Sequence, residues 1–312
     1  MRTIGPLSNR AADEIPESHR DLAECPPVAA LSTVTPYGYP QTSVVWCDFD
    51  GGYLRVNTMR GFAKERNMRR NRRVTLLCYD PRQPLRYLEV RGMVAEMTQV
   101  GAAGHLDSLA SKYAGRPVRF FGDAIPATFA QTEIPVLCRI RPVHAVALDA
   151  AGPSRTSGEE GERTGSIPAQ TLSIPASHHD LLTRPICGVF TTLGNDGQPQ
   201  SSLVWVDLDR ECALVNTTLE RQKGRNLLDN RKVSLLVVDP GNTSRFIQIR
   251  GDAELVTEGA HEHLDTLTRK YTNHPAYYGY IYPHAQRLRE TRVICRIHPR
   301  RVTLDAIHVA DH

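Results

Sequence analysis

The chain contains an internal repeat, and this repeat limits its possible folds more than any other feature. The two copies align without a gap from residues 18–92 to residues 177–251. Three residue types recur 159 positions apart: Trp46 and Trp205, Lys64 and Lys223, and Gly92 and Gly251. A solenoid unit has roughly 20–50 residues, so each copy is long enough to be a domain. Two-fold dimers place shared sites across their interface, and a fused pair can do so within one chain.

Composition divides the chain into four segments. Residues 151–168 (AGPSRTSGEEGERTGSIP) contain almost no apolar side chains, which is typical of a flexible linker. We therefore predict a polar N-terminal segment over 1–17, a first domain over 18–150, a linker over 151–175 and a second domain over 176–312.

Charge, cysteine content and hydropathy exclude several protein classes. The formal net charge of +4 is too small to indicate a nucleic-acid partner. Seven cysteines without a C-x-x-C pair favour reduced thiols and a cytoplasmic location. The chain begins without the apolar core of a signal peptide, and no apolar run approaches the roughly 18 residues of a membrane helix. No His, Cys or carboxylate cluster has convincing metal spacing, so we expect no metal site.

The hydrophobic pattern within each copy is mainly that of β-strands. Runs such as VAALSTV and VTLLCYDP are separated by short turns, including the hairpin signal GNDG at 194–197. Two helices interrupt the strands, and the second has an apolar face at Leu106, Leu109 and Tyr113. The expected fold is mainly β with peripheral helices, with six or so strands closing a small barrel in each copy.

The turn from a strand into the first helix carries the strongest chemical signal. It reads NTTLERQKGRN at 216–226 and NTMRGFAKERN at 57–67. The Asn-Thr pairs are predicted to cap the helix, whose free N–H groups would suit a phosphate. Arg221 and Lys223 add two cations for charge-assisted hydrogen bonds. A solvated basic helix face is the alternative.

Both copies resemble the split-barrel flavin-binding superfamily of pyridoxamine 5′-phosphate oxidase. They are most similar to its flavin- and deazaflavin (coenzyme F-420)-dependent oxidoreductases from actinobacteria. The resemblance rests on AALSTV with GYPQTSVVW in the first copy and on VFTTL with GQPQSSLVW in the second. It also rests on the NT…K…N helix segment of each copy, on YDP or VDP, and on VRG or IRG. It implies two tandem split β-barrel domains, each six-stranded, that form an intramolecular pseudo-dimer with the cofactor at their interface.

Matching the motifs residue by residue implies a cofactor site in each repeat. In repeat 2 the cofactor phosphate would contact Arg221 and Lys223. The pocket around it would be shaped by Asn216, Thr217 and Asn226. The residues near the ring system would be Gln200, Ser201, Ser202 and Trp205. In repeat 1 the corresponding residues are Asn57, Thr58, Lys64, Asn67, Gln41, Ser43 and Trp46. Phe62 stands where repeat 2 has Arg221, so repeat 1 lacks one cation. We expect one competent pocket, led by repeat 2 and completed by repeat 1.

The sequence thus predicts an oxidoreductase that binds coenzyme F-420, our first choice, or FMN, and transfers a hydride to or from a small organic substrate. A cofactor of this type carries the chemistry itself, so no catalytic residue is named. The alternatives are a non-catalytic cofactor carrier and a haem protein using His144 or His298. Two local features also stay open: Tyr277–Tyr282 either packs on the surface or walls a pocket, and two fused units can still self-associate. We expect His19 and His178 to be solvated.

Overall fold

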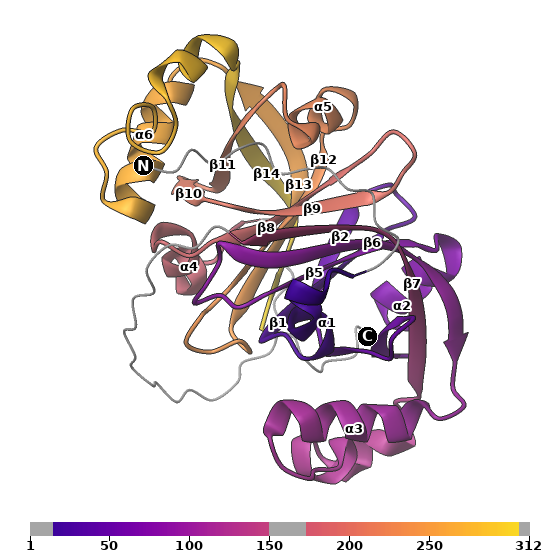
Figure 1. Cartoon of the computed structure of the whole chain (residues 1–312). Coiled ribbons are helices and arrows are strands. Elements are labelled where there is room, and N and C mark those ends of the chain that lie inside the picture. Colours follow the sequence, from indigo (N-terminus) through magenta and orange to yellow (C-terminus); the bar gives the residue numbers. More distant parts are fainter. Residues whose placement is uncertain (1–14, 150–172, 306–312) are drawn as a thin grey trace.

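The computed structural model describes residues 15–149 and 173–305, and each range forms one curled antiparallel sheet (Figure 1). The strands of repeat 1 are β1 (Val28–Val34), β2 (Pro40–Val45), β3 (Cys47–Phe49), β4 (Leu54–Met59), β5 (Arg73–Tyr79), β6 (Arg86–Thr98) and β7 (Pro135–Asp149). Those of repeat 2 are β8 (Gly188–Leu193), β9 (Pro199–Val204), β10 (Val206–Asp209), β11 (Cys212–Thr218), β12 (Lys232–Val238), β13 (Phe246–Val256) and β14 (Arg292–Leu304). Most of residues 1–17 and of the predicted linker lie outside these ranges.

The two sheets have the same topology. Their strand orders are β2-β1-β5-β6-β7-β4-β3 and β9-β8-β12-β13-β14-β11-β10. Each sheet has seven strands, not six, because the run predicted as one strand divides at a tryptophan. Trp46 separates β2 from β3, and Trp205 separates β9 from β10. The mainly β, tandem split-barrel fold is confirmed.

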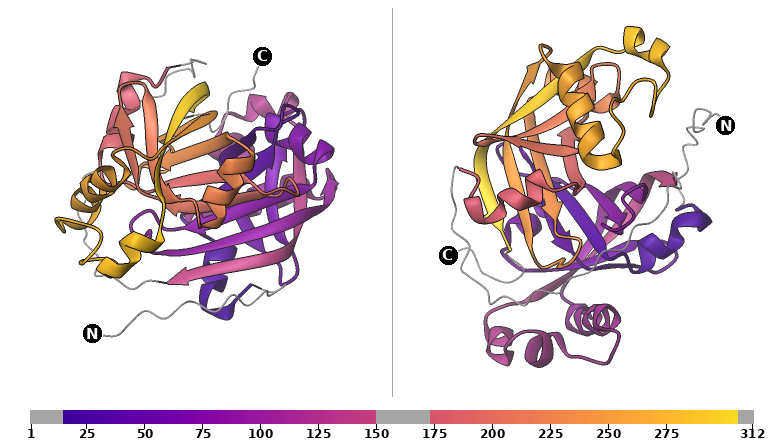
Figure 2. Two further views of the ribbon diagram at one scale, coloured as in Figure 1. Left: turned by 90° about the horizontal axis from the view of Figure 1, so that it is seen from above. Right: turned by 90° about the vertical axis from the view of Figure 1, so that its left-hand side faces the viewer.

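The helices are peripheral, as the sequence predicts, but the described part of each repeat has three α-helices where two were predicted. Repeat 1 has α1 (Arg20–Glu24), α2 (Ala63–Arg70) and α3 (Ala102–Ala114), and repeat 2 has α4 (His179–Thr183), α5 (Gln222–Asp229) and α6 (Ala260–Thr272). Helices α3 and α6 stand at opposite ends of the molecule (Figures 1 and 2). The short 3-10 and π turns are Glu17–His19, Phe120–Ala124, Ala127–Gln131, Ala176–His178 and His284–Arg289. No helix within the described ranges is both long and apolar enough to cross a membrane.

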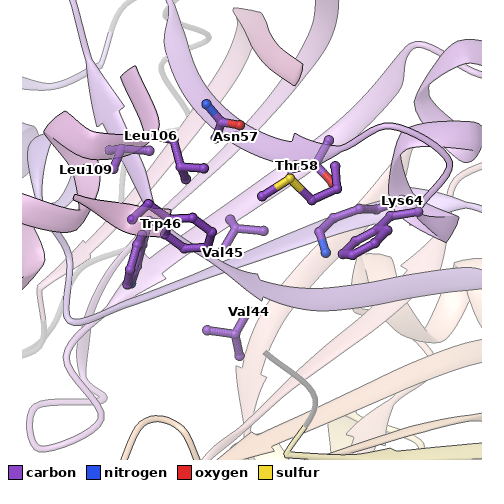
Figure 3. A pocket seen from close by; sticks show the side chains of 11 residues that line it. Val44, Val45, Trp46, Asn57, Thr58, Lys64, Leu106 and Leu109 are labelled. Carbon is purple, nitrogen blue, oxygen red and sulfur yellow. The ribbon is translucent and has the colours of Figure 1, made fainter. Parts of the chain in front are cut away.

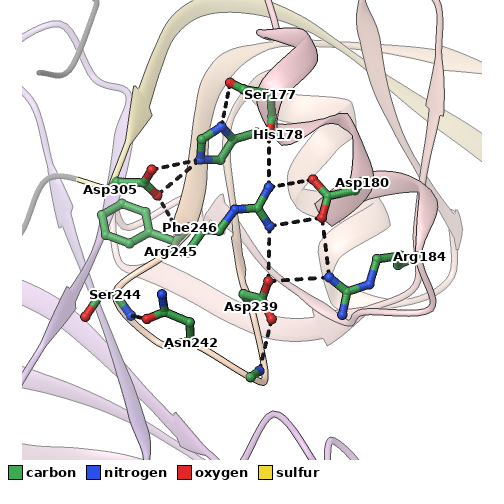
Figure 4. A network of polar contacts seen from close by, with 11 residues as sticks. Ser177, His178, Asp180, Arg184, Asp239, Asn242, Ser244, Arg245, Phe246 and Asp305 are labelled. Carbon is green, nitrogen blue, oxygen red and sulfur yellow. Dashed lines mark hydrogen bonds and ion pairs between the residues drawn. The ribbon is translucent and has the colours of Figure 1, made fainter. Parts of the chain in front are cut away.

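A polar network ties α4, the helix at the start of repeat 2, to the barrel (Figure 4). Arg245 donates to Asp180 at 2.6 and 2.9 Å and to Asp239 at 3.0 Å. His178 is buried, and its Nε2 lies 3.1 Å from both carboxylate oxygens of Asp305. His19 is buried as well, so the expectation that these histidines are solvated is wrong. Each histidine ring holds the end of the last strand of its own repeat against α1 or α4. The local sequence does not reveal this contact.

The two barrels share one apolar core. Its buried residues come from both repeats: Val28, Ala30, Leu77, Tyr79, Val189, Leu236, Val238 and Phe246. Beside it, four buried hydroxyls form a ring that also crosses the interface. Ser32 lies 3.0 Å from Thr191 and 3.0 Å from Ser201, and Thr42 lies 3.0 Å from Thr191. Because Ser32 matches Thr191 and Thr42 matches Ser201, the ring marks the pseudo-two-fold axis between the repeats.

Candidate functional site

The residues expected to cap the first helix lie in a strand instead. Asn57 and Thr58 belong to β4, and the residue that precedes α2 is Phe62. Asn57 donates its side-chain N–H to the carbonyl of Ala102, at the start of α3, over 2.8 Å. Asn216 makes the same contact with Ala260 in repeat 2. The N-cap prediction is therefore wrong, because the asparagines hold α3 and α6 and do not cap α2 and α5.

Repeat 1 contains an apolar cavity beside this strand (Figure 3). Its volume is about 90 Å³. The lining residues are Val44, Val45, Trp46, Asn57, Thr58, Met59, Phe62, Lys64, Leu106, Leu109 and Phe120. Trp46 is held by Tyr113, stacked at 5.4 Å, and by Phe120, edge-on at 5.8 Å. Four of the seven positions predicted for a repeat 1 site, Trp46, Asn57, Thr58 and Lys64, thus line one cavity.

Most of the other predicted positions join α2 or α5 to the sheet. Asn67 donates to Gln41 Oε1 over 2.9 Å and to the hydroxyl of Thr33 over 3.0 Å. In repeat 2, Asn226 donates to Gln200 over 2.9 Å and to Thr192 over 2.9 Å. Ser43 and Ser202 are half-buried on β2 and β9, next to the hydroxyl ring.

A buried arginine lies next to Asn216 in repeat 2. The Arg292 guanidinium donates to Glu290 over 2.8 Å, to the Tyr278 hydroxyl over 2.9 Å and to Asn216 Oδ1 over 3.5 Å. Its Cζ lies 4.9 Å from the centre of the Tyr277 ring. Tyr277 and Tyr278 are thus buried around this arginine, whereas Tyr280, Ile281 and Tyr282 of the same segment are exposed.

Lys223 and Arg221 begin α5 and face residues of repeat 1. Burial lowers the pKa of Lys223 to about 7, with further lowering by Arg221 and Arg292 and an opposing effect of Glu89 on β6. Glu89 is itself buried, pairs with Arg91 at 3.1 Å and accepts the Ser201 backbone N–H over 2.9 Å. Within the described ranges, neither Arg221 nor Lys223 forms an ion pair with a carboxylate.

Sequence reasoning missed Arg292, Glu290 and Glu89. A signal for two of them exists in the repeat comparison, because Pro135 stands where repeat 2 has Arg292 and Gln248 stands where repeat 1 has Glu89. The haem candidates His144 and His298 do not line the cavity, and His298 pairs with Glu254 at 3.0 Å. The described residues include no group of three side chains suited to a metal ion.

Solved structures to which this chain is similar include an F-420 reductase (31% identity, TM-score 0.36), and the match covers 41% of this chain and 98% of that protein. They also include a conserved hypothetical protein from Mycobacterium tuberculosis (24% identity, 45% and 94% coverage, TM-score 0.33). A third is a putative pyridoxamine 5′-phosphate oxidase from Listeria innocua (20% identity, 38% and 86% coverage, TM-score 0.29). No curated protein matches the chain.

The pyridoxamine 5′-phosphate oxidase family model matches the chain twice, over residues 15–134 and 174–304. The second segment covers the whole second sheet, and the first covers the first sheet up to the start of β7. Together they make up well over half of the sequence. The chain therefore belongs to the pyridoxamine 5′-phosphate oxidase family, of which it carries two copies in tandem.

Proposed function

We propose that the chain is an oxidoreductase that binds a flavin-type cofactor, coenzyme F-420 or FMN, between its two barrels. The observation that carries the proposal is the pair of cations at the start of α5. Arg221 and Lys223 have no carboxylate ion pair within the described ranges, and they stand beside the N–H groups of the first turn of a helix. Unpaired N–H groups and cations together fit a phosphate. The bound cofactor would supply hydride transfer to or from a small organic substrate.

The residues around this phosphate position have distinct roles in the proposal. Lys223 and Arg221 bind the anion, and Glu89 of the other repeat keeps Lys223 partly protonated near neutral pH. Arg292 is tied to Glu290, so it acts as a fixed positive charge behind the site. Trp205 stacks on Tyr271 at 5.3 Å and offers a rigid aromatic wall. No residue is assigned a proton-transfer role.

Equilibrium titration of the purified protein with coenzyme F-420 and with FMN tests this proposal. We expect the double variant Arg221→Ala, Lys223→Ala to lose measurable binding, because charge-assisted hydrogen bonds are each worth about 1.5–3 kcal/mol. Lys64→Ala is the matched variant in repeat 1 and should weaken binding less. Equal losses would contradict the leading role of repeat 2. Binding without turnover of any small acceptor would indicate a carrier and not an enzyme.

A further inference from the structure

The two repeats differ at the first residue of their last strand. Pro135 pairs with Met59 in repeat 1, and Arg292 pairs with Thr218 in repeat 2. Met59 and Thr218 are repeat equivalents, so Pro135 and Arg292 occupy the same place in the fold. A glutamate stands two residues earlier in both copies, as Glu133 and Glu290.

In repeat 2 the arginine satisfies the polar groups around it. Glu290 and Asn216 Oδ1 both accept from Arg292, and the guanidinium lies over two tyrosine rings, at 4.9 and 5.6 Å from their centres. A buried guanidinium is stable here because a carboxylate, an amide oxygen and aromatic faces surround it.

In repeat 1 the same acceptors are present and the arginine is not. The Oδ1 of Asn57 and both carboxylate oxygens of Glu133 are buried without a hydrogen-bond partner anywhere in the described chain. Glu133 is only 7% exposed, and burial raises its pKa. A buried carboxylate without a partner is strongly destabilising. Repeat 1 therefore contains the hydrogen-bond acceptors of a guanidinium site without the guanidinium.

The apolar cavity contacts one of these acceptors, Asn57, and Glu133 is not among its lining residues. Asn57 lines it, together with Phe120, which corresponds to Tyr277 beneath the Arg292 guanidinium. Lys64 lines a different part of the wall, away from Asn57 (Figure 3). The cavity of about 90 Å³ has room for a planar guanidinium group but not for a fused ring system.

We propose that the cavity of repeat 1 binds a small organic cation of the guanidinium or amidinium class, with its N–H groups between Asn57 and Glu133. The short apolar chain of this ligand lies against Trp46, Leu106 and Phe120. This site is separate from the phosphate position at Arg221 and Lys223, and it does not depend on the proposed redox function.

Isothermal titration of the whole chain with propylguanidinium tests the proposal, with neutral propylurea as the probe control. We expect saturable binding of propylguanidinium near one per chain and at least about tenfold weaker binding of propylurea. Glu133→Gln should weaken propylguanidinium binding at least about tenfold, since it removes the carboxylate and keeps the shape. Glu290→Gln, the matched change in repeat 2, should leave it unchanged. Pro135→Arg should abolish binding by restoring an internal guanidinium.

Equal affinity for the two probes, or wild-type affinity in Glu133→Gln, would overturn the proposal. If Pro135→Arg does not fold, the paired glutamine variants decide alone. The double variant Arg221→Ala, Lys223→Ala should keep full propylguanidinium affinity even where it loses the cofactor, which separates the two hypotheses. Displacement of propylguanidinium by FMN or coenzyme F-420 would instead assign the cavity to the cofactor and overturn the inference.

Discussion

Lys223 is the residue whose ionisation near neutral pH has a direct consequence for binding. Burial and the nearby Arg221 and Arg292 lower its pKa to about 7, although Glu89 opposes this shift. Its ammonium group is therefore mostly protonated below pH 7 and mostly neutral above it. Binding of an anion favours the protonated form, so the anion affinity contributed by Lys223 decreases as the pH rises through 7.

We predict that the affinity for a phosphate-bearing cofactor falls up to about tenfold between pH 6.5 and 8 because of Lys223. Lys223→Arg should flatten this dependence, since a guanidinium stays charged throughout this range. Titrations at constant ionic strength measure both curves, and the variant corrects for ionisation of the phosphate itself. Identical pH dependence in the two proteins would contradict the assignment.

Single residues also show where sequence reasoning is limited. Trp46 and Lys64, which the repeat comparison singles out, both line the cavity of repeat 1. The roles of Arg292 and Glu290 depend on Tyr278 and Asn216, which are distant along the chain and meet only in the fold. Propensity favoured Asn57 as a cap, but the strand continues past it to Met59.

At the scale of elements, α5 contacts the end of β11 at a glycine that α2 lacks. A Cβ at Gly224 of α5 would lie 2.0 Å from the backbone oxygen of Thr218, so only glycine allows this approach. The corresponding residue of α2 is Glu65, which is buried and pairs with Arg69.

We predict that Gly224→Ala moves the start of α5 away from β11, weakens cofactor binding and destabilises the protein by about 1–3 kcal/mol. Thermal denaturation and cofactor titration measure the two effects. Gly241→Ala is the control, because its new Cβ would meet only the Asp239 carboxylate at an ordinary 3.5 Å. Unchanged binding in a folded Gly224→Ala protein would show that the position of α5 does not matter for the site.

The elements themselves were largely predictable. Alternating hydrophobicity identified the strands, and an apolar face identified α3 and α6. The seventh strand was not predictable, because a tyrosine hydroxyl from α3 or α6 accepts the backbone N–H directly after each tryptophan, and its ring stacks on that tryptophan. That contact joins residues far apart in the sequence, so no local pattern reports it.

At the scale of the molecule, the two barrels are joined through side chains that neither can bury alone. Leu77 and Tyr79 of β5 pack with Leu236 and Val238 of β12 in one core. The Thr75 hydroxyl also donates to the carbonyl of Pro199 across the interface. Burial of apolar area of this kind is the main stabilising contribution in folding and association. Separation of the barrels would expose this surface, so the repeats should unfold together.

We therefore predict a single cooperative unfolding transition for the chain. Leu236→Ala should cost about 2–5 kcal/mol, the usual range for a fully buried leucine, and should lower the denaturation midpoint of both repeats. Single-tryptophan variants that retain either Trp46 or Trp205 report each repeat by fluorescence, and coincident curves are the test of two-state behaviour. Leu288→Ala is the control, since that side chain is exposed. If Leu236→Ala shifts only the Trp205 signal, the barrels are independent, and a cofactor site completed by both repeats would lose its structural basis.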